Sequence, residues 1–477
     1  MPVDVGHDAP AFSHDRDAAE QDLVRRDPGL PGLPLLLDDT ALTTRLRLLA
    51  PEAGIASVKA GYLRYKPGRS CLARIMVRQE NGRKIPGYVH LFSANSPDWD
   101  WQRRRIDKRF RAGTGLSAHA DETTWLQVAH IEHDRRISAM HALLREAEGA
   151  GSGWRMPVVP SAGHAHLMPL RLSPALSALG ADAGWPEETV LPCLPLRYKP
   201  ERRFIGQLLR PDSSAAVLIR ACTPDDFAAT ERGAMIAAAL GGQSLLCSDS
   251  THHLIASRWL EGYSLDPAGA GGWPDAPVLS QVAATVRRLH QAEAPMPLPA
   301  YRPQDHTQAI ARAADACGLL CPALQAEVQA LRGQLDAALC QDEAEAGARA
   351  TLTHGDLSLE QIIRSPDGEL HLIDWDNAAH GDPLGDLGSL LARLIMQSLD
   401  LPAAQRPAPL ELVDAFSTDY DAGLSARERR SIGIYTAGHL LRLMPEGFRI
   451  RRADWPARMQ ALLKTAQDIT QRLTSSR

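Results

Sequence analysis

The sequence predicts an α+β fold, in which a β-rich region precedes a helical C-terminal half. Two pairs of apolar runs, within residues 63–92 and 196–227, are divided by turn-forming residues and predict antiparallel strands. Beyond residue 263, apolar residues recur at helical spacing, as in the run 278–289, and a long helix is expected over 309–346. A single short hairpin is expected within this helical half, at residues 362–373, where an Asp-Gly pair separates two apolar runs.

The composition and charge of the chain argue against a nucleic-acid-binding, secreted or membrane protein. The chain has 477 residues and a formal net charge of -5, which gives no sign of a nucleic-acid-binding surface. Its polar, acidic N-terminus does not resemble a signal peptide, and no apolar run is long enough to cross a membrane. The seven scattered cysteines indicate reduced thiols, so we expect a cytoplasmic protein that binds neither nucleic acid nor membrane.

A five-residue repeat stands out in the β-rich region. The sequence LRYKP occurs at 63–67 and again at 196–200, each time beside a predicted strand pair. Two copies are too few for a solenoid, so we interpret them as a duplicated small sheet. The alternative is coincidence between two basic strands.

Residues 100–190 carry few structural signals. The basic run 101–111 predicts the solvated face of a helix, or alternatively an anion site. The spacing of His119, His130, His133 and His141 fits no metal-binding motif.

The most informative stretch is 353–390, which contains five polar groups in a fixed order. They are Asp356 within His354-Gly355-Asp356, then Gln361, Asp374, Asp382 and Asp386. Phosphoryl transfer requires a carboxylate that accepts a hydroxyl proton and hard oxygen ligands that hold magnesium on the nucleotide phosphates. The alternative is that these carboxylates only cap helices and turns, and Asp382 before Pro383 is indeed placed to cap a helix.

This stretch resembles the aminoglycoside phosphotransferase and choline kinase family, a branch of the protein-kinase-like fold. The family pattern is H-G-D-L/F-x-x-x-N, then I-D-W/F, then G-D-P-x-x-D-L-A. The sequence follows it except that Gln361 replaces the usual asparagine, which keeps the amide oxygen on a longer stem. Maltokinase-like sugar kinases show a similar glutamine form.

The resemblance implies ATP and Mg²⁺ as cofactors and assigns roles to the residues of the motif. Asp356 would be the catalytic base within the motif that His354 opens, and Gln361 and Asp374 would bind the metal. Asp376, Asp382 and Asp386 would contact the substrate or support the loop.

The resemblance also implies a small nucleotide-binding lobe upstream. Arg220 falls where the family's third strand usually carries lysine, and Glu231 where the following helix carries its ion-pair partner. Trp259 and Glu261 flank the expected hinge against the adenine. The earlier sheet has His90 at the position of Arg220, which argues against a second nucleotide site there.

These expectations define a two-lobed, protein-kinase-like α+β fold with an additional N-terminal α+β region. The expected parts are a flexible segment 1–38, a cap-like region 39–190, a small nucleotide-binding lobe 191–262 and a helical catalytic lobe 263–477.

The expected activity is transfer of the γ-phosphate of ATP to a hydroxyl of a small molecule, such as a sugar, amino sugar or aminoglycoside. The missing small-lobe lysine and the absence of a glycine-rich phosphate loop leave two alternatives open. One is a nucleotide-binding pseudokinase or assembly factor without transfer activity, and the other is a scaffold built on the duplicated sheet. The sequence does not indicate the oligomeric state.

Overall fold

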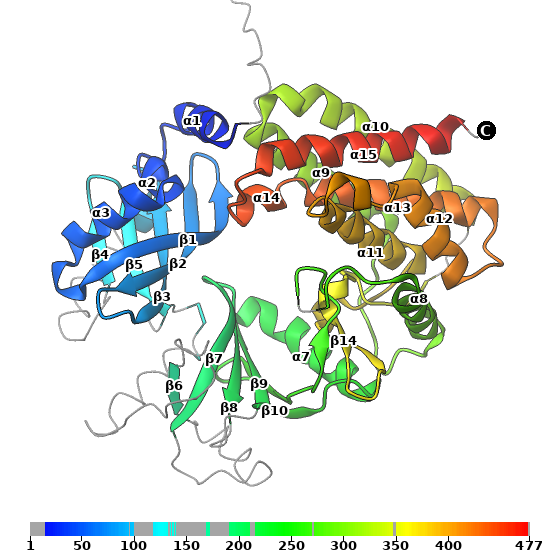
Figure 1. The fold of residues 1–477 in the computed structure, drawn as a ribbon, viewed down its shortest axis with the longest axis horizontal. Helices are drawn as coiled ribbons and strands as arrows, with labels where there is room; N and C mark the ends of the chain where they lie inside the picture. The colour runs from blue at the N-terminus through cyan, green and yellow to red at the C-terminus, as the bar shows by residue number, and fades with distance from the viewer. Residues whose placement is uncertain are drawn as a thin grey trace, which may run out of the picture. The chain divides into compact units, whose positions relative to one another are not determined.

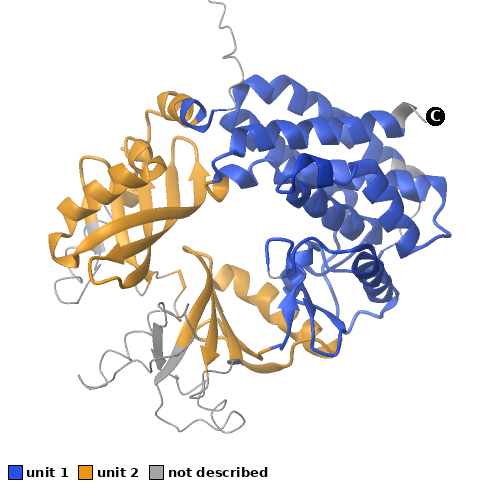
Figure 2. Cartoon of the chain, in the orientation of Figure 1, with its two compact units in different colours: residues 1–19, 260–448, 452–477 blue, residues 20–259, 449–451 orange. Residues whose placement is uncertain are grey.

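The fold is described by a computed structural model, which forms two compact units (Figure 2). Unit 1 contains residues 1–19, 260–448 and 452–477, and unit 2 contains residues 20–259 and 449–451. The residues described are 15–94, 96–99, 118–131, 134, 136–137, 139, 168–171, 190–209, 215–269, 271–346 and 350–475. Several positions considered in the sequence lie outside them: the basic run 101–111, His133 and His141.

Unit 2 contains two antiparallel sheets (Figure 1). Its elements are α1 (Arg16–Arg26, which unit 2 includes from Glu20), α2 (Leu33–Leu37), α3 (Asp39–Leu49), β1 (Ile55–Lys66), β2 (Ser70–Gln79), β3 (Lys84–Phe92), β4 (Ala118–Asp121), β5 (Leu126–His130), β6 (Met168–Arg171), β7 (Val190–Lys199), β8 (Arg203–Leu209), β9 (Ala215–Cys222), α7 (Pro224–Ala239), β10 (Leu245–Asp249) and β11 (Leu254–Arg258). Residues 449–451 belong to this unit because the Arg451 guanidinium donates to the carbonyls of Leu36 and Leu37.

The two sheets have the same strand order. The first runs β1-β2-β3-β5-β4, and the second runs β7-β8-β9-β11-β10 with β6 added beside β7. The register is equivalent as well, because Lys66 pairs with Ser70 at the first hairpin and Lys199 pairs with Arg203 at the second. A buried cluster that includes Leu72 of the first sheet and Phe204 of the second joins them. The predicted duplication is therefore present in the fold, with each LRYKP ending a strand and entering a hairpin turn.

Each LRYKP turn is held by a buried aspartate that precedes it in the chain. In the first repeat, Asp27 Oδ2 accepts hydrogen bonds from the Tyr65 hydroxyl at 2.7 Å and from the Gly68 backbone N–H at 2.9 Å. Because Asp27 follows α1, this contact ties the N-terminal helix to the first sheet.

The second repeat has the same arrangement. Asp134 Oδ2 accepts from the Tyr198 hydroxyl at 2.8 Å and from the Glu201 backbone N–H at 2.7 Å. The repeated unit thus includes the aspartate before each sheet as well as the strands.

The N-terminal segment differs from the expectation. Residues 16–37 form α1 and α2 where a flexible segment was expected. The helices are stable because Leu23, Leu33 and Leu36 are buried, which offsets the turn-forming tendency of the prolines and glycines between them.

Unit 1 carries most of the helices among the described residues. Its elements are β12 (Tyr263–Ser264), α8 (Ala276–Gln291), α9 (Pro303–Leu320), α10 (Gln325–Ala346), β13 (Thr351–Thr353), β14 (Ile362–Arg364), β15 (Leu370–Leu372), β16 (Ala379–Gly381), α11 (Pro383–Ser398), α12 (Pro409–Tyr420), α13 (Ala426–Leu443), α14 (Glu446–Arg449, in unit 1 as far as Phe448) and α15 (Trp455–Ser475). The helix predicted over 309–346 is two helices, because Pro322 follows α9 and cannot continue its hydrogen-bond ladder. The two large sheets lie before residue 260 in the chain, and the helices α8 to α15 follow it. This separation confirms the α+β class.

Two small sheets position the loops between these helices. Strand β12 pairs with β14, which pairs with β15, and β13 pairs with β16. Gly262 precedes β12 with φ +135°, and an added Cβ would lie 2.2 Å from the Arg364 carbonyl oxygen. A side chain at Gly262 would therefore push β12 away from the hairpin.

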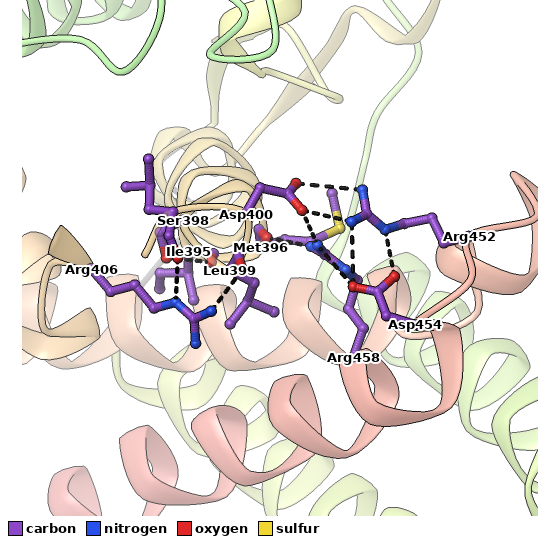
Figure 3. Close-up of polar contacts among 10 residues, drawn as sticks. Ile395, Met396, Ser398, Leu399, Asp400, Arg406, Arg452, Asp454 and Arg458 are labelled. Atoms are coloured by element: carbon purple, nitrogen blue, oxygen red, sulfur yellow. Dashed lines mark hydrogen bonds and ion pairs between the residues drawn. The ribbon is translucent and has the colours of Figure 1, made fainter. Parts of the chain in front are cut away.

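The C-terminal end of α11 is held by arginines (Figure 3). Arg406 donates to the Leu399 carbonyl at 2.9 Å and Arg458 to the Met396 carbonyl at 2.8 Å. Asp400 pairs with Arg458 and with Arg452, the latter at 2.6 Å. Carbonyls at a helix C-terminus lack intrahelical partners, so these cations stabilise α11, whose other end carries Asp382 and Asp386.

Candidate active site

A buried carboxylate determines the backbone of the His354-Gly355-Asp356 loop. Asp386, on the first turn of α11, accepts from the backbone N–H of His354 at 2.6 Å and of Gly355 at 2.8 Å. Gly355 has φ +83°, and an added Cβ would lie 2.2 Å from the Asn377 carbonyl oxygen. Only glycine fits there, and the loop leads directly into Asp356.

Asp386 has a further partner that links α8 to α11. His290 Nε2 lies 3.2 Å from Asp386 Oδ2, and His290 Nδ1 lies 2.9 Å from the Tyr420 hydroxyl. Although burial alone would raise it, the pKa of Asp386 lies below its ordinary value because His290 and His354 stabilise the charged form. Among the two roles considered for Asp386, this geometry favours support of the loop.

The His354 side chain connects the loop to the hairpin. Its Nε2 lies 2.9 Å from the Ile373 carbonyl oxygen, and its ring packs against Trp375 with the centroids 4.8 Å apart. His354 is completely buried. It is therefore placed to hold Asp356 and Asp374 in register, without facing solvent.

Gln361 and Asp374 lie at the same end of the β14–β15 hairpin. Ile362 pairs with Leu372, and the Ile373 backbone N–H donates to the Gln361 carbonyl at 2.9 Å. The Gln361 side-chain oxygen accepts from the Ser358 hydroxyl at 3.2 Å. The hairpin thus brings two residues thirteen positions apart to one edge.

Asp374 has an unusual backbone. Its φ is +66°, in the left-handed region that non-glycine residues rarely occupy. Such strain persists where the surroundings determine the conformation, and it is common at functional sites. Asp374 is followed by a short 3-10 helix, Trp375–Asn377, and the Trp375 ring N–H donates to the Leu372 carbonyl at 3.0 Å.

Asp356 lies in a half-buried position close to other charges. Burial raises its pKa, which the positive charges of Arg393 and Arg442 oppose. Arg393 is on α11 and pairs with Glu446 at 3.5 Å, and Arg442 on α13 donates to His439 Nδ1 at 3.2 Å.

The two arginines did not emerge from the sequence. A signal existed for Arg393, which follows Asp386 by seven residues and so lies on the same face of α11. Nothing local marked Arg442, because it comes from a different helix.

The other predicted residues of this unit lie nearby along the chain. Asp382 Oδ1 accepts from the Leu384 backbone N–H at 2.9 Å, as expected for an N-cap, and Asp382 Oδ2 accepts from the Tyr435 hydroxyl at 3.1 Å. Asp376 is half-buried in the 3-10 helix that follows Asp374.

The predicted nucleotide-contacting residues are divided between the units. Arg220 is buried on β9, and Glu231, on α7, accepts from the Ser248 hydroxyl at 2.5 Å. Trp259 ends the long segment of unit 2, whereas Glu261 is exposed in unit 1. The structure brings together the residues from His354 to Asp386, and the roles of all these residues remain predictions.

The donor set is compatible with a magnesium ion that also binds nucleotide phosphates. Within the described residues, no group of three or more His, Cys, Asp and Glu side chains is arranged to hold a metal. Mg²⁺ in nucleotide enzymes commonly uses only one or two protein carboxylates, with phosphate and water oxygens as the other ligands. Asp374 and the Gln361 amide fit that requirement.

Among the described residues, no helix combines the length and the apolar character that crossing a membrane requires.

Comparison with known proteins identifies a family over part of the chain. Residues 228–428 match the model of the phosphotransferase enzyme family, a range that includes α7 and the loop from His354 to Asp386. The resemblance inferred from the motifs is therefore confirmed for this region. No curated protein sequence matches the chain.

Solved structures similar to this chain include choline or ethanolamine kinases and aminoglycoside phosphotransferases. A choline/ethanolamine kinase family protein from Mesorhizobium loti is 16% identical, with 58% of this chain and 87% of that chain covered and a TM-score of 0.42. A choline kinase from Cryptosporidium parvum is 11% identical, covering 60% and 90%, with a TM-score of 0.45. A Streptomyces rimosus aminoglycoside phosphotransferase, solved with ADP and streptomycin, is 19% identical, covering 55% and 96%, with a TM-score of 0.38.

Proposed function

We propose that this chain, whose residues 228–428 match the phosphotransferase enzyme family, transfers the γ-phosphate of ATP to a hydroxyl group of a small molecule. One observation carries the proposal. Asp386 and His354 fix a loop and a hairpin that bring Asp356, Gln361 and Asp374 into one constellation. A protein that only bound nucleotide would not require a proton acceptor held in this way.

Each residue has a role that its geometry supports. Asp356 orients the acceptor hydroxyl and receives its proton, and its raised pKa makes it a better base than an exposed aspartate. Asp374 and Gln361 would hold Mg²⁺, which neutralises charge on the phosphates when bound. His354 and Asp386 keep the loop in position, and Asp382 and Asp376 are candidates for contact with substrate.

Arg220 and Glu231 are proposed to contact the nucleotide, and Trp259 and Glu261 are proposed to flank the hinge. An arginine at position 220 can bind phosphate oxygens through two donors, whereas lysine offers a single point charge. The hydrogen bond between Glu231 and Ser248 fixes the glutamate on α7.

The acceptor is proposed to be a sugar, an amino sugar or an aminoglycoside. Arg393 and Arg442 bring positive charge near Asp356, whereas Asp374 brings negative charge there, so an acceptor panel must include neutral and cationic compounds.

The test is a substitution of the proposed base with a matched control. Asp356→Asn should lower kcat by about 10²- to 10⁴-fold at unchanged ATP affinity, because the amide cannot accept the proton. Asp367→Asn, in the exposed hairpin turn, is the control and should retain full activity. Transfer would be measured with a panel of sugars, amino sugars and aminoglycosides.

Two outcomes would overturn the proposal. Equal turnover in the Asp356→Asn variant would remove Asp356 from its role. Nucleotide binding without transfer or hydrolysis above the Asp356→Asn background, for any acceptor, would favour the pseudokinase alternative.

A further inference from the structure

The turns of the two repeats differ at one position of their backbone. Gly68 and Glu201 are equivalent, since each donates its N–H to the aspartate that holds the turn. Both have left-handed backbone angles, with φ +66° and +55°. Glycine adopts this conformation without strain, whereas glutamate does so at an energetic cost that other contacts must offset.

The Glu201 side chain makes contacts that offset the cost of its left-handed backbone conformation. Its carboxylate lies 2.9 Å from Arg64 Nη2 and 3.3 Å from His90 Nδ1, both of the first repeat. The three side chains are 17%, 27% and 12% exposed, so water screens the group only partly. Burial alone would raise the pKa of Glu201, yet it lies below the ordinary value because His90 and Arg64 stabilise the carboxylate.

Glu201 contacts His90, which occupies in the first repeat the position that Arg220, a proposed nucleotide contact, occupies in the second. His90 pairs with Leu72 on β2, and Arg220 pairs with Ile205 on β8, at matching places in the two sheets. The basic residues of the first repeat are therefore already occupied by a carboxylate of the second repeat.

The turn that Glu201 anchors is connected to the proposed nucleotide residues. The Arg202 carbonyl accepts from the Thr223 backbone N–H at 3.1 Å. Thr223 is the N-cap of α7, and it lies in the chain between Arg220 on β9 and Glu231 on α7. Moving the turn would therefore move the junction that carries both residues.

From these contacts we infer that the first repeat acts as an internal clamp. It binds the Glu201 carboxylate through Arg64 and His90 in place of a nucleotide phosphate, and so fixes the turn beside Arg220 and Glu231. Glu201 is thereby a positioning residue for the nucleotide-binding part of unit 2. The clamp itself follows from unit 2 alone, whereas its effect on nucleotide rests on the proposed function.

The first experiment tests the clamp without any nucleotide. In the full chain, Glu201→Gln and Glu201→Gly should speed amide hydrogen exchange in residues 201–202 by tenfold or more. Glu80→Gln, an exposed glutamate of the first repeat, is the matched control and should leave that exchange unchanged. Because Glu201→Gln keeps the left-handed strain and removes only the charge, a melting temperature equal to that of the wild type in this variant would show that the carboxylate contributes nothing and would overturn the clamp.

The second experiment tests whether Arg64 and His90 form a binding site for a carboxylate. In Glu201→Gly, 50 mM sodium formate should restore at least half of the lost melting temperature, since formate can bind Arg64 and His90. The double variant Arg64→Ala, Glu201→Gly should show no such recovery, and sodium chloride at the same concentration should not replace formate. Equal recovery in the single and double variants would refute a specific carboxylate site.

The third measurement separates the clamp from the proposed function. Glu201→Gln should raise KM for ATP about tenfold while kcat changes less than threefold. If the wild-type chain binds no nucleotide, the proposed function fails, yet the exchange and formate results still decide the clamp. If KM is unchanged while exchange is faster, the positioning role is refuted and the clamp is structural.

Discussion

Two buried aspartates, one in each unit, perform the same structural task under opposite electrostatic conditions. Asp386 is 2% exposed and Asp134 is 1% exposed, and each accepts backbone N–H groups of a loop. The pKa of Asp386 is lowered, whereas that of Asp134 is raised to about 6.

The partners explain the difference. Both carboxylates are desolvated, which raises the pKa, but Asp386 has two backbone N–H donors and His290 to stabilise its charge. Asp134 has one such N–H and the Tyr198 hydroxyl, and it also faces the negative charge of Glu201. Burial alone therefore does not determine whether a carboxylate is ionised, because the number and charge of its donors decide.

The largest effect is expected for Asp386→Ala. Removing this carboxylate leaves two buried N–H groups and His290 without their acceptor, so the free energy of unfolding should fall by about 3–5 kcal/mol. Asp134→Ala, which strands one N–H and one hydroxyl, should lose about 1–3 kcal/mol. Urea denaturation of both variants measures the difference, and equal losses would contradict the comparison.

Asp134 should also give a characteristic pH dependence. Its folded pKa of about 6 is above the ordinary 3.8, so its stabilising contribution is complete below about pH 4 and is lost as pH rises through 6. The change is on the order of 3 kcal/mol between pH 4 and pH 7. The wild type should lose this stability relative to Asp134→Asn over that range, and parallel pH profiles would refute the assignment.

Replacing His290 should make Asp386 resemble Asp134. In His290→Phe the carboxylate loses its imidazole partner, and the free energy of unfolding should fall by about 2 kcal/mol. In the wild type, the pKa of Asp386 is lowered, so its contribution to the free energy of unfolding is present above pH 3.8 and is lost under more acidic conditions. In the variant, acid denaturation should begin at higher pH, and an unchanged acid midpoint would show that His290 does not set this pKa.

The smallest effects are expected at the tyrosines that hold the two repeat turns. Tyr198→Phe and Tyr65→Phe each remove one hydrogen bond to an aspartate, so each should cost about 1 kcal/mol. Denaturation of the two variants side by side tests whether the repeats are equivalent in energy as they are in register. If only one of the two substitutions lowered the free energy of unfolding, the repeats would be equivalent in geometry but not in energy.

Local sequence signals predicted much of the candidate active site. Turns and helix caps depend on neighbouring residues, so the sequence predicted the Asp-Gly hairpin and the helix start at Asp382-Pro383. It also contained the ordered polar residues from Asp356 to Asp386. The helices α1 and α2 were missed, because their stability depends on burial against other elements and their Pro-Gly content suggests a loop. Pro322 marks the end of α9 in the sequence as well, because proline cannot continue the helical hydrogen bonds.

The sequence by itself determined the β-rich and helical halves, the repeated LRYKP segments and the constellation of the candidate active site. Only the tertiary structure decided how distant residues pair. Glu201 contacts Arg64 across 137 positions, and His290 reaches Asp386 across 96. Such contacts follow no local periodicity, because they form only after packing brings separate elements together. The loop geometry around Asp356 and the clamp on the second repeat are therefore properties of the folded chain.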